Sequence, residues 1–305
     1  METAHKEEQF DLRRMATEFC HDEYADYIAY KRLVSIEFNK ERKKKLEVIA
    51  KTEHDHFDFW KKYSFPFKPS LKSILYSYFL MLLRLIFGVT FAIKLLERGE
   101  EKAVERYRTA LDLMQTEEDK KAVERIIQDE LEHERYFVSQ LDEVIVKYMS
   151  ALVLGLADAI IEITGTHAGT LGTTNSTIIT GAVGLVVGIS AAISMASASY
   201  LQTKHETGKS PTIAALITGS GYILAVALMS LPYFILNNIL LAFVISIAIS
   251  ILLVMIFTFQ GSVYTNSSFI VDFLQTVGLV LGVALLAYFL GDILSATLGI
   301  RGLIK

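Results

Sequence analysis

The stretch IIQDELEHERYF, residues 126–137, decides the fold of this chain because an earlier stretch repeats its chemistry. Glu130 and His133 form an E-x-x-H pair, and residues at positions i and i+3 of a helix lie on the same face. Glu53 and His56 form a second E-x-x-H pair, 77 residues earlier. The carboxylate and the imidazole of each pair are therefore predicted to reach toward one point.

The same 77-residue offset links Glu100 to Glu23 and Tyr107 to Tyr30, which indicates a duplicated helix pair. In dinuclear four-helix bundles, two helices each supply a Glu and the other two each supply Glu-x-x-His. A single E-x-x-H can arise by chance in a helix rich in Glu and His, but two copies at one offset favour a metal site. The predicted ligands are Glu23, Glu53, His56, Glu100, Glu130 and His133, with Glu97 and Glu101 as alternatives to Glu100.

The donor types indicate which metal this site would bind. Carboxylates and imidazoles suit iron or manganese. Cys20 is the only cysteine, so a disulfide within the chain is impossible and a thiolate zinc site is disfavoured. We therefore expect two iron ions per bundle, with manganese as the alternative.

These residues resemble the rubrerythrin branch of the ferritin-like family. The motif G-E-x-x-A-x-x-x-Y at residues 99–107 is similar to the ligand-helix motif of that family. Glu23 with Tyr30 is a looser copy, and Asp26 stands where the family pattern has Ala. The resemblance implies a ferritin-like diiron domain over residues 1–148.

Charge is distributed unevenly over the 305 residues, since most charged residues precede residue 148 and the remainder is close to uncharged. The sequence therefore predicts an all-α protein, with a four-helix bundle followed by a transmembrane domain over residues 149–305. The net charge of −4 is too small to indicate a partner, but the lack of a basic stripe with interleaved aromatic residues argues against nucleic acid. The charged first 20 residues lack an apolar segment, so no cleavable signal peptide is expected.

The bundle helices are predicted at residues 7–37, 38–63, 85–114 and 117–147, the last running on into the first membrane span. Residues 72–96 are strongly apolar, but Arg84 divides them into runs of about ten residues, which is short for a span. We interpret them as the long crossover of the bundle, resting on the bilayer surface, with a true span as the alternative.

Five apolar segments are each long enough to span a membrane: residues 150–174, 177–201, 211–236, 239–259 and 269–298. The second loop contains Lys204 and Lys209, whereas the first and third loops contain no Lys or Arg. The positive-inside rule therefore predicts a multi-pass protein with its N-terminal domain in the cytosol, although Arg301 and Lys305 fall on the opposite side.

Asp158 and Glu162 lie four residues apart on the first span, so they share one face of a helix in hydrocarbon. Carboxylates there are costly and usually face a transport pathway or a partner; the alternative is that both reach an interface. Met195 on the second span offers a soft thioether ligand, and small residues around it permit close helix packing.

This half resembles the vacuolar iron transporter family. The motif G-L-x-D at residues 155–158, S-M-A at 194–196 followed by Tyr200, and GVALLAYFLG at 282–291 carry the resemblance. Ser199 departs from the family pattern, which has Glu there, and the family's cytosolic insertion between spans two and three is absent. The N-terminal bundle replaces that insertion, a combination that resembles the membrane-bound ferritin-like proteins of prokaryotes.

The resemblance implies export of cytosolic Fe²⁺ or Mn²⁺ in exchange for protons, by a homodimer in the prokaryotic cell membrane. Pairing first spans would bring together Asp158, Glu162 and Met195 from two copies. A membrane-anchored diiron ferroxidase or peroxidase is the alternative, to which Tyr30 and Tyr107 would contribute redox-active rings, and a metal sensor or scaffold is a third. Carboxylates inside a span favour transport, because an anchor has no use for them; ferroxidase activity coupled to transport is left open.

Overall fold

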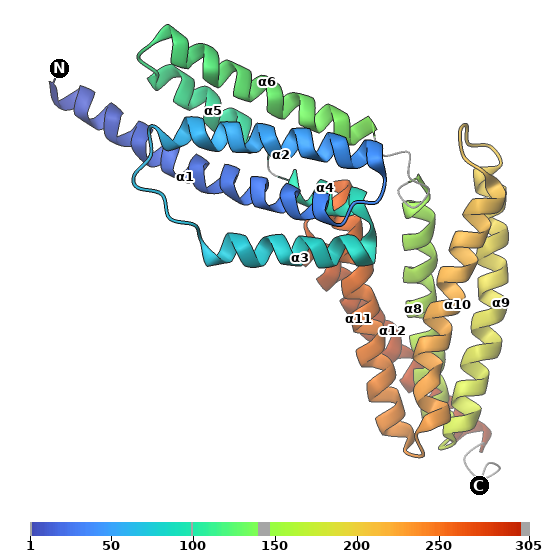
Figure 1. Ribbon diagram of the computed structural model, residues 1–305. Helices are drawn as coiled ribbons and strands as arrows, with labels where there is room; N and C mark the ends of the chain where they lie inside the picture. The colour runs from blue at the N-terminus through green and yellow to red at the C-terminus, as the bar shows by residue number, and fades with distance from the viewer. Residues whose placement is uncertain (1, 99, 140–146, 300–305) are drawn as a thin grey trace. The chain divides into compact units, whose positions relative to one another are not determined.

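The structure is a computed structural model that describes residues 2–98, 100–139 and 147–299, with side chains described for residues 9–98, 102–133 and 147–299. The regular elements of these residues are all helices (Figure 1). The chain divides into two compact units, residues 1–143 and 144–305. The predicted all-α class is confirmed.

The first unit is built from two helical hairpins with a crossover between them. Helices α1 and α2 form one hairpin and α5 and α6 the other, and contacts of α1 with α5 and of α2 with α6 join them (Figure 1). The crossover consists of α3, which packs along α1, and the short α4. The bounds are α1 (Glu2–Ser35), α2 (Lys40–Lys61), α3 (Leu71–Phe87), α4 (Val89–Leu96), α5 (Glu100–Leu113) and α6 (Glu117–Ser139).

Side-chain caps fix the starts of two bundle helices. The Asn39 side chain accepts hydrogen bonds from the backbone N–H groups of Glu41 and Arg42 at the start of α2. The Thr116 hydroxyl accepts a hydrogen bond from the backbone N–H of Asp119 and donates one to the Asp119 carboxylate at the start of α6. These caps fix the residues at which the two helices with the E-x-x-H pairs begin.

Two apolar clusters fill the first unit and leave a polar layer between them. The first cluster joins α1, α2, α3 and α4, and includes Leu33, Leu46, Leu80 and Leu96. The second joins α1, α2, α5 and α6 around Trp60. Along α1 and α2 the candidate metal ligands occupy the positions between these clusters, so apolar packing on both sides holds them in place.

The prediction of one helix over residues 85–114 is wrong. Gly88 has φ 90°, a conformation that side-chain-bearing residues rarely adopt, and it separates α3 from α4. A second break follows α4, and α5 begins at Glu100. The α4 segment is buried on nearly all sides, so it serves as a core element of the crossover and not as the first turns of a ligand helix.

The junction of the two predicted domains falls on residues 140–146, which lie outside the described residues. The prediction that the fourth bundle helix runs on into the first span therefore stays a prediction over that stretch. On its far side, Tyr148 lies in a turn, and the first membrane helix begins at Met149.

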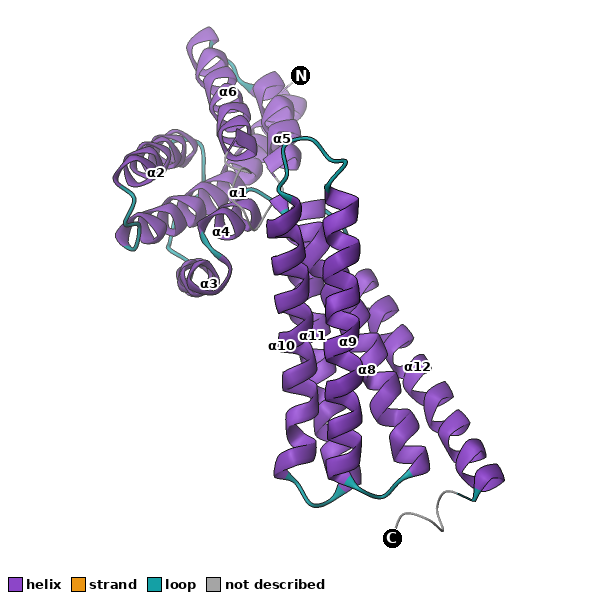
Figure 2. Cartoon of the chain, turned by 90° about the vertical axis from the view of Figure 1, so that its right-hand side faces the viewer, coloured by secondary structure: helices purple, strands orange, loops and turns teal. Residues whose placement is uncertain are grey.

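Among the described residues of the second unit, five helices are long and apolar enough to cross a membrane (Figure 2). Their bounds match the five predicted spans within a few residues, except that the fourth extends six residues further than expected. Helix α8 packs against each of the other four helices and is the centre of the unit. The bounds are α8 (Met149–Thr173), α9 (Thr177–Thr203), α10 (Pro211–Ile235), α11 (Ile239–Thr265) and α12 (Phe269–Leu298).

Glycines permit a close helix crossing in this unit, between α8 and α12. A Cβ added to Gly291 would overlap the backbone oxygen of Gly169, and one added to Gly172 would lie 2.7 Å from the backbone nitrogen of Asp292. Backbone-to-backbone packing of this kind fixes the central helix, which carries both predicted intramembrane carboxylates.

Candidate metal centre and membrane sites

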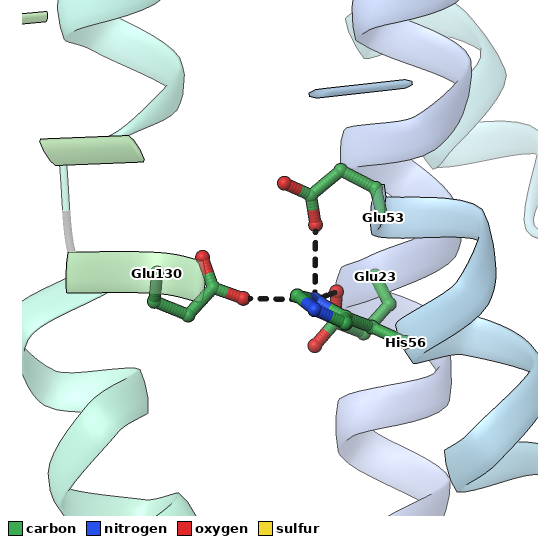
Figure 3. A group of neighbouring side chains, drawn as sticks. All are labelled: Glu23, Glu53, His56 and Glu130. Carbon is green, nitrogen blue, oxygen red and sulfur yellow. Dashed lines mark ion pairs between the residues drawn. The ribbon is translucent and has the colours of Figure 1, made fainter. Parts of the chain in front are cut away.

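Four side chains from three helices converge in the polar layer of the first unit. Glu23 comes from α1, Glu53 and His56 from α2, and Glu130 from α6 (Figure 3). All four are buried, and one ligand atom from each lies within 4.8 Å of one ligand atom of every other. This cluster, called the Glu/His cluster below, can hold a metal ion.

The two E-x-x-H pairs face each other reciprocally. Nδ1 of His56 lies 3.2 Å from Oε1 of Glu130, and Nδ1 of His133 lies 3.0 Å from Oε1 of Glu53. Each histidine therefore meets the glutamate of the other pair, and Glu23 adds a carboxylate oxygen 3.5 Å from Nδ1 of His56. Of the six predicted ligands, these five lie together around one centre.

The sixth predicted ligand, Glu100, begins α5, but its side chain lies outside the described residues, as does that of the alternative Glu101. The other alternative, Glu97, is buried at the end of α4. Glu97 also contributes to raising the pKa of Asp26, whose pKa is raised first by burial and then by neighbouring carboxylates. The position where the rubrerythrin pattern has Ala therefore adds a further acidic group beside the cluster.

The charges in the cluster are balanced by protons on its histidines. Burial by itself lowers the pKa of His56, but ion pairs with four carboxylates, of which that of Asp129 contributes most, raise it well above its usual range. Burial likewise lowers the pKa of His133, while ion pairs with Glu130 and Glu53 raise it to about 10. At neutral pH both imidazoles carry a proton that a metal ion would have to displace.

The same buried surroundings shift the pKa values of Glu23 and Glu53 in opposite directions. Burial raises the pKa of Glu23 well above its usual range, against the opposing effect of the ion pair with His56. Burial also acts to raise the pKa of Glu53, but ion pairs with His133 and His56 outweigh it and lower the pKa below its usual range. Two carboxyl groups in one buried site thus differ in affinity for protons, as expected where several charges share little water.

Buried polar atoms in the cluster lack hydrogen-bond partners of acceptable geometry. Among the described side chains, Oε1 of Glu53 and Nδ1 of both His56 and His133 are buried without such a partner. These atoms lie at ion-pair distance from oppositely charged neighbours but are not aligned as hydrogen bonds, an arrangement that fits side chains able to hold a metal ion. Two imidazoles and three carboxylates, without a thiolate, suit iron or manganese and fit the predicted metal.

Aromatic and acidic neighbours hold these ligands in position. The Tyr107 hydroxyl donates a hydrogen bond of 2.5 Å to Oε1 of Glu23, and the Tyr107 ring stacks on Trp60 with ring centroids 5.5 Å apart. Oδ2 of Asp129 lies 3.2 Å from Nε2 of His56, which leaves Nδ1 of that ring for a metal. Asp129 was not among the residues predicted for the site, although it directly precedes the predicted ligand Glu130.

In the second unit, the two predicted carboxylates meet at one tyrosine. The hydroxyl of Tyr222 on α10 donates a hydrogen bond to Oε2 of Glu162, and Asp158 interacts with the same hydroxyl. Tyr222 is fully buried, Glu162 is half-buried and Asp158 is exposed on the surface of the unit. The pair thus reaches from the interior of the helical unit to its surface.

Met195 lines a small cavity of about 110 Å³ between α8 and α9. Ser199, which stands where the transporter family has Glu, also lines it and accepts a hydrogen bond of 3.0 Å from the Thr218 hydroxyl. Glu206, in the loop after α9, lines the same cavity and pairs with Lys209 at 2.8 Å. A carboxylate is therefore present at this cavity, although not at the position that the family pattern predicts.

A second polar cluster in this unit was missed from the sequence. His167 of α8 is fully buried, with Nδ1 3.2 Å from the Ser246 hydroxyl and Nε2 3.4 Å from the Ser230 hydroxyl. The ring of Tyr233 packs against it with centroids 4.4 Å apart. An ionisable residue inside an apolar segment is a reason to expect a functional site there, so His167 could have been identified from the sequence.

Comparisons of the chain with protein-family models, with curated proteins and with solved structures find no match. The resemblances to rubrerythrins and to vacuolar iron transporters therefore remain interpretations of motifs.

Proposed function

We propose that this chain is a divalent-metal transporter whose N-terminal bundle captures the metal. The observation that carries the proposal is the Glu/His cluster, buried in a chain that also contains five helices able to cross a membrane. Asp158 and Glu162, which meet at Tyr222, would form the metal-binding part of the pathway. A unit that served only as an anchor would gain nothing from carboxylates in a span.

The proposed direction is export from the cytosol. Lys204 and Lys209 lie in the loop between α9 and α10, and the positive-inside rule places that loop, with the N-terminal domain, in the cytosol. The cargo is Fe²⁺ or Mn²⁺, for which the donor set of the cluster is suited. Because a carboxylate binds metal only after losing its proton, metal and protons would compete at Asp158 and Glu162, which supports exchange of metal against protons.

We further propose that the first unit is a ferritin-like, rubrerythrin-type domain, and that the second belongs with the vacuolar iron transporters. The reciprocal contacts of the two E-x-x-H pairs support the first assignment, because a duplicated helix pair predicts them. The motif around Asp158 supports the second. This combination is that of the membrane-bound ferritin-like proteins of prokaryotic cell membranes.

A homodimer is part of the proposal. Asp158 is exposed on the surface of the membrane unit, where a lone carboxylate would face hydrocarbon. Pairing α8 helices across a two-fold axis would enclose two copies of Asp158 in one pathway. Leu154, exposed one turn earlier on α8, gives the test: Leu154→Cys should cross-link between copies in membranes, and purely monomeric products would contradict the pairing.

A ferroxidase or peroxidase anchored by the five helices is the second candidate. The Tyr107 hydroxyl bound to Glu23 and the stacked Trp60 place oxidisable rings beside the cluster, which favours electron transfer there. Oxidation in the bundle is compatible with transport as well. The two candidates differ in whether metal crosses the bilayer.

The deciding experiment measures metal flux in proteoliposomes that contain the full chain. A transporter should take up Fe²⁺ and Mn²⁺ into vesicles with an acidic lumen, with alkalinisation of the lumen during uptake. If the chain oxidised Fe²⁺ but accumulated neither metal above the level of protein-free vesicles, the anchored oxidase would be established instead.

A further inference from the structure

Helix α3 presents an apolar face that the described residues of the first unit leave largely exposed, although the Arg32 guanidinium of α1 lies 3.4 Å from the ring centroid of Tyr78 on it. Seven large apolar side chains lie on it, each between 46% and 71% exposed: Leu71, Leu75, Tyr78, Phe79, Leu82, Leu85 and Ile86. Their spacing of three and four residues places them within one stripe along the helix, called the α3 stripe below. Solvent-facing sides of bundle helices are ordinarily polar, so a continuous stripe of this kind requires a partner.

The opposite face of α3 is already committed to the bundle. Ser77, Leu80 and Leu83 are buried on it, and Leu80 belongs to the apolar cluster shared with α1. Arg84 turns inward as well, donating to the backbone oxygen of Ile36 at 2.6 Å and to Oε2 of Glu37 at 2.8 Å. The helix therefore cannot rotate to hide the stripe. Because Arg84 faces the bundle, its charge does not interrupt the stripe.

Apart from the inward-facing Arg84, charged side chains of α3 and of the segment just before it lie at the N-terminal end of the helix. Residues 73–83 contain no charged side chain. Lys68 and Lys72, both exposed, lie just before and at the start of the helix. A basic end followed by an apolar stripe with aromatic rings matches the composition of helices that lie in the interface of a bilayer with anionic lipids.

The length of α3 and its packing against α1 argue against a membrane-spanning position. Its 17 residues correspond to about 25 Å of helix, short of the roughly 30 Å of a hydrocarbon core. One side packs along α1, so lipid cannot surround the helix. In Figures 1 and 2, α3 lies on the side of α1 away from α6, at the edge of the first unit. An in-plane position is the one that exposes the stripe alone to lipid.

We propose that the α3 stripe binds the surface of the lipid bilayer, with Lys68 and Lys72 contacting anionic headgroups. The five candidate spans supply the partner, because they hold a bilayer within reach of the first unit of the same chain. Binding within one chain avoids most of the entropic cost of association, an advantage that a second protein copy does not share. The stripe restricts the orientation of the bundle at the membrane, whatever metal the bundle binds.

The test uses the full chain with single reporters. In a Cys20→Ala background, Leu82→Cys places a polarity-sensitive fluorophore in the stripe, and Lys121→Cys places it on an exposed position of α6. The labelled chains are reconstituted in vesicles of phosphatidylcholine and phosphatidylglycerol. Doxyl quenchers are attached to the lipids either near the headgroup or near the chain end.

We expect the Leu82 reporter to be blue-shifted and quenched most strongly by the shallow quencher, whereas the Lys121 reporter should be affected by neither. Adding Leu75→Glu and Phe79→Glu should abolish most of that quenching, and Lys68→Gln with Lys72→Gln should weaken it only when phosphatidylglycerol is present. An unquenched Leu82 reporter would mean that protein or water covers the stripe, and predominant quenching from the chain end would mean a span; either result overturns the proposal.

Discussion

Nδ1 of His133 lies 3.0 Å from Oε1 of Glu53, and these residues belong to different copies of the repeated E-x-x-H pair. The matching contact, from His56 to Glu130, is 3.2 Å. The repeat therefore has a structural meaning: each copy completes the site of the other. Neither hairpin holds the full set of described ligands by itself, so metal binding should join the two hairpins.

Replacement of Glu130 by Gln should lower metal affinity of the full chain by at least about 100-fold, because loss of outer-shell partners alone costs about 10–100-fold. Glu124→Gln is the matched control, since Glu124 is an exposed carboxylate on the same helix. Titration with Mn²⁺ or Co²⁺, followed by calorimetry or absorption, measures both. Equal affinity of the two variants would remove Glu130 from the site.

Metal affinity should rise with pH up to the folded-state pKa of the histidines. The pKa of His133 is about 10 in the folded protein against 6.5 for a free side chain. Its proton stabilises the metal-free fold below pH 6.5, and that contribution is lost as pH rises toward 10. The melting temperature of the metal-free protein should therefore fall over this window, while the increase on adding metal should grow. A metal-induced increase that did not change with pH would contradict protonated histidines in the metal-free site.

Tyr107→Phe should weaken metal binding by about 10-fold, because Glu23 loses the hydroxyl that orients it while the stacking on Trp60 remains. Tyr24→Phe, outside the cluster but within the aromatic packing of α1, serves as the control. Metal titration of both variants, with melting temperatures alongside, separates orientation of the ligand from general loss of packing. Unchanged affinity in Tyr107→Phe would show that Glu23 is held by other contacts.

Gly291→Ala should destabilise the membrane unit by about 1–3 kcal/mol, the usual cost of overpacking, because its Cβ would overlap the Gly169 backbone. Gly282→Ala on the same helix has open space around its Cβ and should leave stability unchanged. Thermal unfolding of the two variants in detergent makes the comparison. Equal melting temperatures would mean that α8 and α12 do not cross this closely.

Local spacing was sufficient to predict the ligands that lie on long, regular helices. Glu23, Glu53, His56, Glu130 and His133 could be placed because helical periodicity fixes which residues share a face. The spans could be placed because apolar length is a local property. In both cases the information is contained within one element or in the repeat of one element.

Contacts between distant residues could not be read in the same way. The start of the third bundle helix was misjudged because the apolar pattern continues through Gly88, whereas a pairing of Arg84 with Glu37, 47 residues away, fixes α3 against the end of α1. Asp129 was missed because its role depends on His56 of another helix. The burial of His167 likewise depends on serines of α10 and α11.

The most direct test of the account is metal flux in proteoliposomes across a range of metal concentrations, for three variants of the full chain. Asp158→Asn should abolish flux at every concentration while the bundle still binds metal. Glu130→Gln should lower flux when metal is scarce and leave it nearly unchanged at saturation, because a capture domain raises only local concentration. Asp272→Asn, a carboxylate bound to Ser267 at the start of α12, should behave as wild type. Wild-type flux in Asp158→Asn would contradict the proposed pathway, and with it the claim that this chain moves metal through its membrane unit.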